Sequence, residues 1–99
     1  MHALMIDGES HTIEPVEVAC LADIAKLVGH DSIIADEIDR EDVVYFDEDC
    51  FIRGTNGRFQ VDKLPPIAGR GVAVGRAQGG KLSDVSLSLA ELKDRTAFL

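Results

Sequence analysis

The chain has 99 residues, of which 45% are hydrophobic and 28% are charged, and its formal net charge is −8. These values are typical of one folded domain and exclude a disordered chain. Apolar runs such as Ala3–Ile6 and Val43–Phe46 are far shorter than the roughly 20 residues of a membrane span. The N-terminus lacks the basic flank and cleavage site of a secretory signal. We therefore expect a single domain over residues 1–99, located in the cytoplasm and not on a membrane.

The negative charge is concentrated in the first half of the chain. Residues 1–49 carry 14 acidic and two basic side chains, whereas residues 50–99 carry four acidic and eight basic ones. Proteins that bind nucleic acids usually present a basic face, so we expect no direct nucleic-acid binding. A looser basic group comprises Arg53, Arg58, Lys63, Arg70 and Arg76. We interpret it as solubilising charge with some local pairing to the acids.

The N-terminal segment predicts a β-hairpin. Two stretches with apolar residues, Ala3–Ile6 and His11–Val18, flank the turn signal Asp7-Gly8. Pro15 has no N–H to donate to a neighbouring strand, which predicts that the second arm lies at the edge of the sheet.

A helix is predicted directly after the hairpin. Its apolar residues recur at helical spacing and are Leu21, Ile24, Ala25 and Val28. Gly29 is suited to end the helix because glycine readily adopts the left-handed conformation. Cys20 falls on the same apolar stripe, so we expect its side chain in the core.

The rest of the chain alternates between strand and turn signals. Strands are predicted at Ser32–Ile38, Asp42–Phe46, Cys50–Arg53, Arg58–Val61 and Gly71–Val74. Val85, Leu87 and Leu89 alternate with serines, as in one more strand, and Ser88–Glu91 has the form of a capping box that opens a last helix to about Ala97.

Strands therefore outnumber helices, and few connections are long enough for parallel crossovers. We predict an α+β domain with a mainly antiparallel sheet, an N-terminal hairpin, one central helix and a short C-terminal helix.

Several short segments occur in a familiar order. They are Leu27-Val28-Gly29, Ile33–Ile38, Val43–Asp49, Leu64-Pro65 and Gly71–Gly75. With the N-terminal hairpin and the helix that ends at Gly29, they cover roughly residues 3–75 and resemble the DUF3846 family of small proteins from phages, plasmids and other bacterial mobile elements. The chain departs from the family pattern at Pro66 and Ile67, where an asparagine usually follows Leu-Pro. The resemblance implies a compact α+β fold and a mobile-element origin, and it carries over no catalytic residue.

The densest feature of the sequence is the acidic stretch Asp36–Asp49, which contains a single base, Arg40. Its acids are Asp36, Glu37, Asp39, Glu41, Asp42, Asp47, Glu48 and Asp49. They are interpreted as a solvated surface around a short strand, as an interaction face for a basic protein, or as a mimic of nucleic-acid phosphates. Mimicry by one strand is sparse, because its acids lie about 6 Å apart against about 1.7 Å per charge in duplex DNA.

No residue pattern indicates catalysis or metal binding. A Ca²⁺ loop needs a central glycine that residues 47–52 lack, and His2, His11 and His30 have no zinc-ligand spacing. Cys20 and Cys50 lie in apolar surroundings typical of core residues, not of nucleophiles. We predict no catalytic residue, no metal and no cofactor, and a protein that is not an enzyme.

The C-terminal helix needs a surface on which to pack, because a helix of about ten residues is marginal alone in water. Its apolar residues Leu92, Phe98 and Leu99 either pack on the chain's own sheet or cross to a second subunit. We expect a homodimer through these residues, since Pro15 makes its sheet edge poorly suited to β-pairing between copies.

These features favour a non-enzymatic domain that acts through protein contacts, with a protein partner and self-association. The alternative is an acidic inhibitor that mimics nucleic acid and blocks a host defence or DNA-binding protein. A small hydrolase or metal enzyme is the third class considered.

Overall fold

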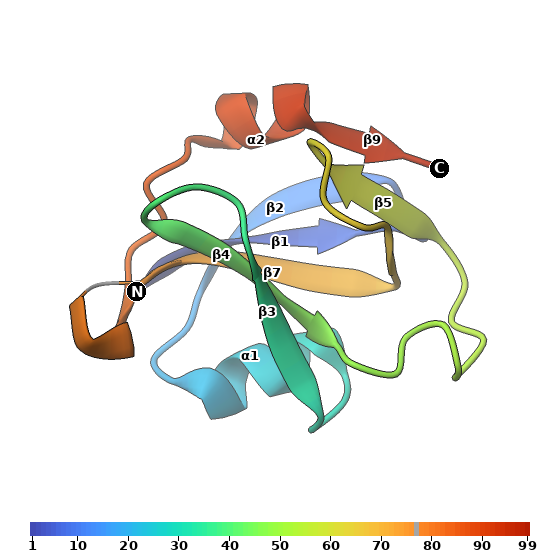
Figure 1. Ribbon diagram of the computed structural model, residues 1–99, viewed down its shortest axis with the longest axis horizontal. Helices are drawn as coiled ribbons and strands as arrows, with labels where there is room; N and C mark the ends of the chain where they lie inside the picture. Colours follow the sequence, from blue (N-terminus) through green and yellow to red (C-terminus); the bar gives the residue numbers. More distant parts are fainter. Residues whose placement is uncertain (77) are drawn as a thin grey trace.

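The computed structural model describes residues 1–76 and 78–99 and arranges them in two sheets and two α-helices (Figure 1). The elements are β1 (His2–Asp7), β2 (Thr12–Glu17), α1 (Leu21–Val28), β3 (Ile33–Glu37), β4 (Asp42–Asp47), β5 (Arg58–Val61), β6 (Ile67–Ala68), β7 (Arg70–Arg76), the 3-10 turn η1 (Gln78–Gly80), β8 (Leu82–Ser83), α2 (Leu89–Arg95) and β9 (Thr96–Phe98). The predicted α+β class is confirmed, with its N-terminal hairpin and C-terminal helix.

The main sheet has the strand order β2-β1-β7-β4-β3, and every neighbouring pair is antiparallel. β8 extends the sheet by pairing with the end of β7. The central strand β7 is covered on both faces, because Val72, Ala73 and Val74 are all fully buried. A second, smaller antiparallel sheet has the order β6-β5-β9.

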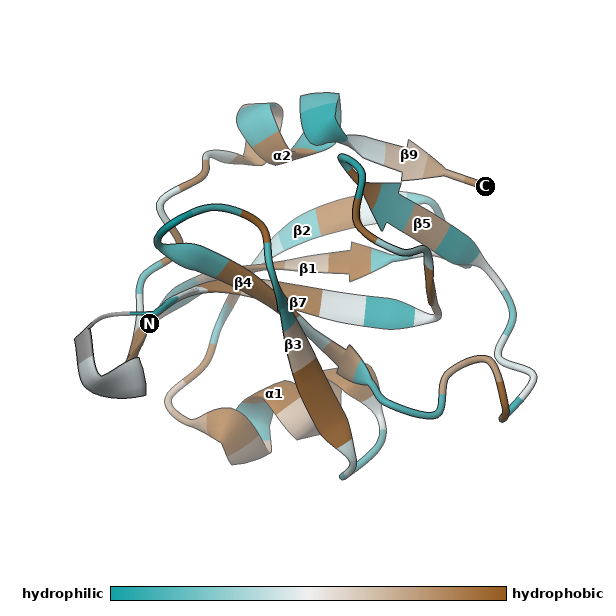
Figure 2. Ribbon diagram, viewed as in Figure 1, coloured by the Kyte–Doolittle hydropathy of each residue, from teal (hydrophilic) through white to brown (hydrophobic). Residues whose placement is uncertain are grey.

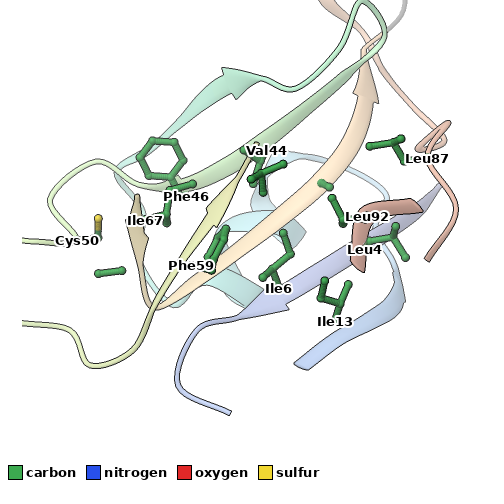
Figure 3. Packing of buried hydrophobic residues seen from close by; sticks show 13 residues of the cluster. Leu4, Ile6, Ile13, Val44, Phe46, Cys50, Phe59, Ile67, Leu87 and Leu92 are labelled. Carbon is green, nitrogen blue, oxygen red and sulfur yellow. The ribbon is translucent and has the colours of Figure 1, made fainter. Parts of the chain in front are cut away.

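The main sheet separates two hydrophobic clusters. α1 lies on one face, and the small sheet and α2 lie on the other (Figure 1). Successive residues of a strand alternate between these faces, so Val72 packs with Ile24 of α1 whereas Ala73 belongs to the other cluster. In that second cluster, Phe59 of β5 and Leu92 of α2 lie over the main sheet (Figure 3).

Gly71 allows the two layers to approach closely. A Cβ atom built at this position of β7 would lie 2.7 Å from Cζ of Phe59, a distance that real Cβ atoms do not show. Phe59 is itself fully buried, so its ring has no free space to which it could move. The absence of a side chain at position 71 therefore sets the spacing between the main sheet and β5.

The predicted central helix is confirmed, with one correction. Gly29 is left-handed at φ 94°, and its N–H donates to the carbonyl of Ala25 at 2.8 Å. Cys20, expected in the core, instead occupies the N-cap position and is exposed, because the helix begins one residue later at Leu21. Cys50 is buried, as expected.

Two predicted strands are wrong. Cys50–Arg53 forms turns between β4 and β5, and residues 84–87 form an irregular connection, after which Leu89 opens α2. The alternation of serine and leucine suggested a strand, but no strand forms here. Leu87 is buried because hydrogen bonds from the neighbouring Ser86 to Asp42 hold this connection against the core.

The capping box of the C-terminal helix is confirmed. The N–H of Glu91 donates to Oγ of Ser88, and the N–H of Ser88 donates to Oε1 of Glu91, both at 3.1 Å. The helix ends at Arg95, earlier than predicted, and the chain continues as β9 alongside β5.

The docking of α2 corrects the expectation for Leu92. Leu92 is fully buried in the chain's own core, so it cannot contact a second subunit. Phe98 is partly buried against the same cluster and stacks on His11 with ring centroids 4.9 Å apart. Of the three residues expected at a dimer interface, only Leu99 is largely exposed, at 60%.

The two cysteines provide a test of this fold. In native protein, a thiol reagent should modify the exposed Cys20 quickly and Cys50 only after unfolding, because a buried thiol is inaccessible to the reagent. Mass spectrometry before and after denaturant should therefore find one modified cysteine and then two. Rapid native modification at Cys50 would contradict the packing around it.

Candidate interaction surface

The acids of the stretch Asp36–Asp49 do not form one uniform surface. Six are exposed or half-buried, on β3, in the turn after it and at the start of the turn after β4. Asp42 and Asp47, at the two ends of β4, are buried with 0% and 3% exposure. The structure thus removes these two from the predicted interaction residues and gives each an internal role.

Asp42 joins β4 to the connection that precedes α2. Its Oδ1 accepts a hydrogen bond from the N–H of Ser86 at 2.9 Å, and its Oδ2 accepts from the hydroxyl of Ser86 at 2.8 Å and the N–H of Leu87 at 2.9 Å. Three donors satisfy this buried carboxylate, which is the condition for burying a charge at tolerable cost.

Asp47 organises the turn after β4. Its Oδ1 accepts from the N–H of Asp49 at 3.0 Å, and its Oδ2 accepts from Nε of Arg53 at 2.7 Å. Nε2 of His30 lies 3.7 Å from the same Oδ2. Asp47 therefore connects the residues after α1 with the turn between β4 and β5.

Two further acids of the stretch have arginine partners. Glu37 pairs with Arg76 at 2.8 Å. Asp39 accepts two hydrogen bonds from Arg95, at 2.7 and 3.0 Å, and the same guanidinium also binds Asp62. The hydrogen bonds from Arg95 lower the pKa of Asp39 despite the opposing effect of partial desolvation, and both aspartates raise the pKa of Arg95.

The remaining acids keep most of their negative charge toward solvent. Among the described residues, Asp36, Glu41 and Glu48 have no ion pair, and Asp49 has only a contact of 3.8 Å with Arg53. We call the solvent-facing set on and beside β3 the acidic edge. It consists of Asp36, Glu37, Asp39, Glu41 and Glu48.

Three members of the basic group form local ion pairs with acids. Arg53 and Arg76 bind acids of the stretch, and Arg70 binds Asp7 at 3.3 Å. Burial raises the pKa of Asp7, but hydrogen bonds from two backbone N–H groups and the charge of Arg70 outweigh burial and lower the pKa overall. Arg58 lies over the ring of Phe51, 5.4 Å from its centroid.

Within residues 1–76 and 78–99, no group of three or more His, Cys, Asp and Glu side chains could hold a metal ion. A surface hollow lies at the C-terminal end of α1 and is lined in part by Lys26, His30, Ser32 and Arg53. His30 and Arg53 lie beside the carboxylate of Asp47, and the hollow is at the negative end of the helix dipole, so it is not a favourable anion site.

Neither described α-helix has the length and apolar character needed to cross a membrane. Comparison of the chain with family models, with curated proteins and with solved structures found no match. The resemblance to DUF3846 and the functions inferred from the sequence therefore stay predictions.

Replacement of the buried carboxylate should destabilise the fold. Asp42→Ala leaves three donors of Ser86 and Leu87 without their acceptor, and we expect a loss of about 3 kcal/mol in unfolding free energy. In a domain of this size that loss lowers Tm by more than about 10 °C. The matched control is Glu41→Ala, an exposed neighbour that should change Tm by no more than about 2 °C. Equal effects of the two variants would contradict the role of Asp42.

The pKa of Asp39 should depend on Arg95. NMR titration should give Asp39 a pKa below the ordinary 3.8 in the wild type, returning toward 3.8 in Arg95→Met. Because the folded-state pKa is lowered, the pair stabilises the fold above pH 3.8 and loses this contribution as pH falls through the folded-state pKa. Lys93→Met removes a neighbouring exposed charge as the control, and an unchanged Asp39 titration in Arg95→Met would refute the assignment.

Proposed function

We propose that the protein is a non-enzymatic domain that binds a basic protein partner through the acidic edge. The observation that carries this proposal is the division of the acids in the stretch 36–49. Asp42 and Asp47 serve the fold, whereas Asp36, Glu41 and Glu48, on and beside β3, have no cationic partner within residues 1–76 and 78–99. Unneutralised surface charge of one sign attracts partners of opposite charge and speeds their association.

Burial of the acids at both ends of β4 also favours this function over mimicry of nucleic acid. A mimic would need closely spaced rows of charge, and β4 contributes no solvent-facing carboxylate to a row beside β3. A basic protein needs only a few exposed acids in one place.

The proposal includes a cytoplasmic location and, from the family resemblance, a mobile-element origin. Cys20 and Cys50 are both free thiols, which suits a reducing compartment. The net charge of −8 on every copy opposes self-association through this surface, so the partner is expected to be a different protein.

A comparison of two charge-matched variants tests the proposal. The edge variant carries Asp36→Asn, Glu41→Gln and Glu48→Gln, and the control carries Glu9→Gln, Glu14→Gln and Asp94→Asn at exposed positions elsewhere. Each is used as bait in extracts of the source cell at low and high salt. We expect wild type and control to capture the same basic protein at low salt, and the edge variant to lose it.

High salt should release the partner, since ionic strength near 1 M shortens the Debye length to about 3 Å. Purified partner and bait should then reproduce the difference by calorimetry. If the edge variant keeps the same captured proteins as wild type, the proposed function is wrong.

A further inference from the structure

β3 is an outer strand of the main sheet, and among the described strands β4 is its one neighbour. The pairing at its two ends fixes which backbone groups face β4. The N–H of Glu48 donates to the carbonyl of Ser32, and the N–H of Ile38 donates to the carbonyl of Asp42, both at 2.9 Å. In an antiparallel ladder the hydrogen-bonded residues alternate along the strand. The even-numbered residues of this segment therefore bond to β4.

The odd-numbered residues of β3 consequently point their backbone groups away from the sheet. Ile33 agrees with this alternation, because its N–H turns back to the carbonyl of Asp31 at 3.1 Å and not to β4. The N–H and C=O of Ala35 and Glu37 face outward, where no strand of the described chain lies. Such a row of free donors and acceptors is a template for an added strand.

The other outer strand of the main sheet, β2, has a proline at one of its outward-facing positions. On β2, the N–H of Val18 donates to the carbonyl of Met1 at 3.0 Å, which makes position 18 face β1 and position 15 face outward. Pro15 stands there without an N–H, so the outward row of β2 lacks a donor. β3 contains no proline and is the strand of the two that can accept a partner.

The sequence of β3 begins with apolar residues and ends with acidic ones, and the hydropathy colours of the ribbon change accordingly from brown to teal (Figure 2). Ile34 is 40% exposed although it lies on an ordered strand beside Phe46. Asp36 and Glu37 follow it at the other end, and only Glu37 has an arginine partner. An antiparallel segment along this edge, followed from its N-terminus, would meet the carboxylates first and the isoleucines second.

We infer that β3 accepts an extended segment of the basic partner as an added antiparallel strand. Basic residues of that segment lie opposite Asp36 and Glu37, and aliphatic residues lie opposite Ile33 and Ile34, because directly opposed side chains share a face. The inference rests on the proposed function and adds the mode of binding and the chemistry of the bound segment.

A second copy of this chain fits the edge less well. Antiparallel pairing of two β3 strands about Ala35 would place Asp36 opposite Ile34 and Glu37 opposite Ile33, twice in each dimer. Each acid would then face an apolar side chain, and two chains of charge −8 would be brought together. Charge complementarity therefore favours a basic segment from another protein.

A synthetic peptide tests the binding mode on the intact protein. The probe is acetyl-Ser-Lys-Arg-Thr-Val-Val-Ser-amide, whose central threonine lies opposite Ala35 when its basic residues face the acids. Two N-methylated forms serve as a matched pair. Methylation at threonine removes the N–H that would donate to the carbonyl of Ala35, whereas methylation at arginine removes an N–H that would point to solvent.

We expect the threonine-methylated peptide to bind about tenfold more weakly than the parent and the arginine-methylated peptide within about twofold of it. Amide hydrogen exchange at Ala35 and Glu37 should slow when the parent peptide binds. A scrambled peptide of the same charge that binds equally well, or equal affinities of the two methylated forms, would overturn strand addition and leave the proposed function intact.

Failure of the parent peptide to bind at about 1 mM would also overturn the inference, since that limit corresponds to a Kd too weak for specific pairing. The proposed function is judged separately, by the capture experiment with the charge-matched variants. Protection of Ala35 and Glu37 in concentrated protein without peptide would instead identify a second copy as the occupant and refute the basic segment.

Discussion

The buried carboxylate of Asp42 ties the connection before α2 to the main sheet through three hydrogen bonds. The carboxylate accepts hydrogen bonds from Ser86 and Leu87, which lie more than forty positions later in the chain. The backbone carbonyl of Asp42 accepts from the N–H groups of Ile38 and Asp39. α2 begins immediately after the segment that Asp42 holds, so the placement of Leu92 over the main sheet follows from this anchor. A charged acceptor with all its donors in place also specifies one arrangement of the connection among the many that apolar packing alone would tolerate.

Elements with strong local signals could be predicted from the sequence. α1 has helical spacing and a terminal glycine, the hairpin has its turn residues, and the Ser88–Glu91 capping box is contained in four consecutive residues. Elements defined by distant partners could not be predicted. β6 and β9 are very short and exist because β5 lies between them, and nothing within residues 96–98 indicates a strand.

The candidate site was predictable as a region but not residue by residue. In a run of acids, Asp42 and Asp47 look like their neighbours, and only the donors that reach them from Ser86, Leu87 and Arg53 reveal their burial. The sequence gives one weak signal for their burial: Asp42 and Asp47 directly flank the β-prone run 43–46. The sorting of the remaining acids into paired and unpaired ones depends on arginines from β7 and α2, far away in the sequence.

The close approach of Phe59 to Gly71 limits which substitutions these two positions can accept during evolution. A methyl group at position 71 would meet the ring of Phe59 and also Cγ2 of Val44, 3.0 Å away, so a smaller residue at position 59 would relieve only part of the crowding and glycine is the residue that fits. Exposed positions have no such steric restriction and tolerate substitution more readily. We therefore expect distant relatives of this chain to keep a glycine at this place in the central strand, with an aromatic residue twelve positions before it, after overall sequence similarity has decayed.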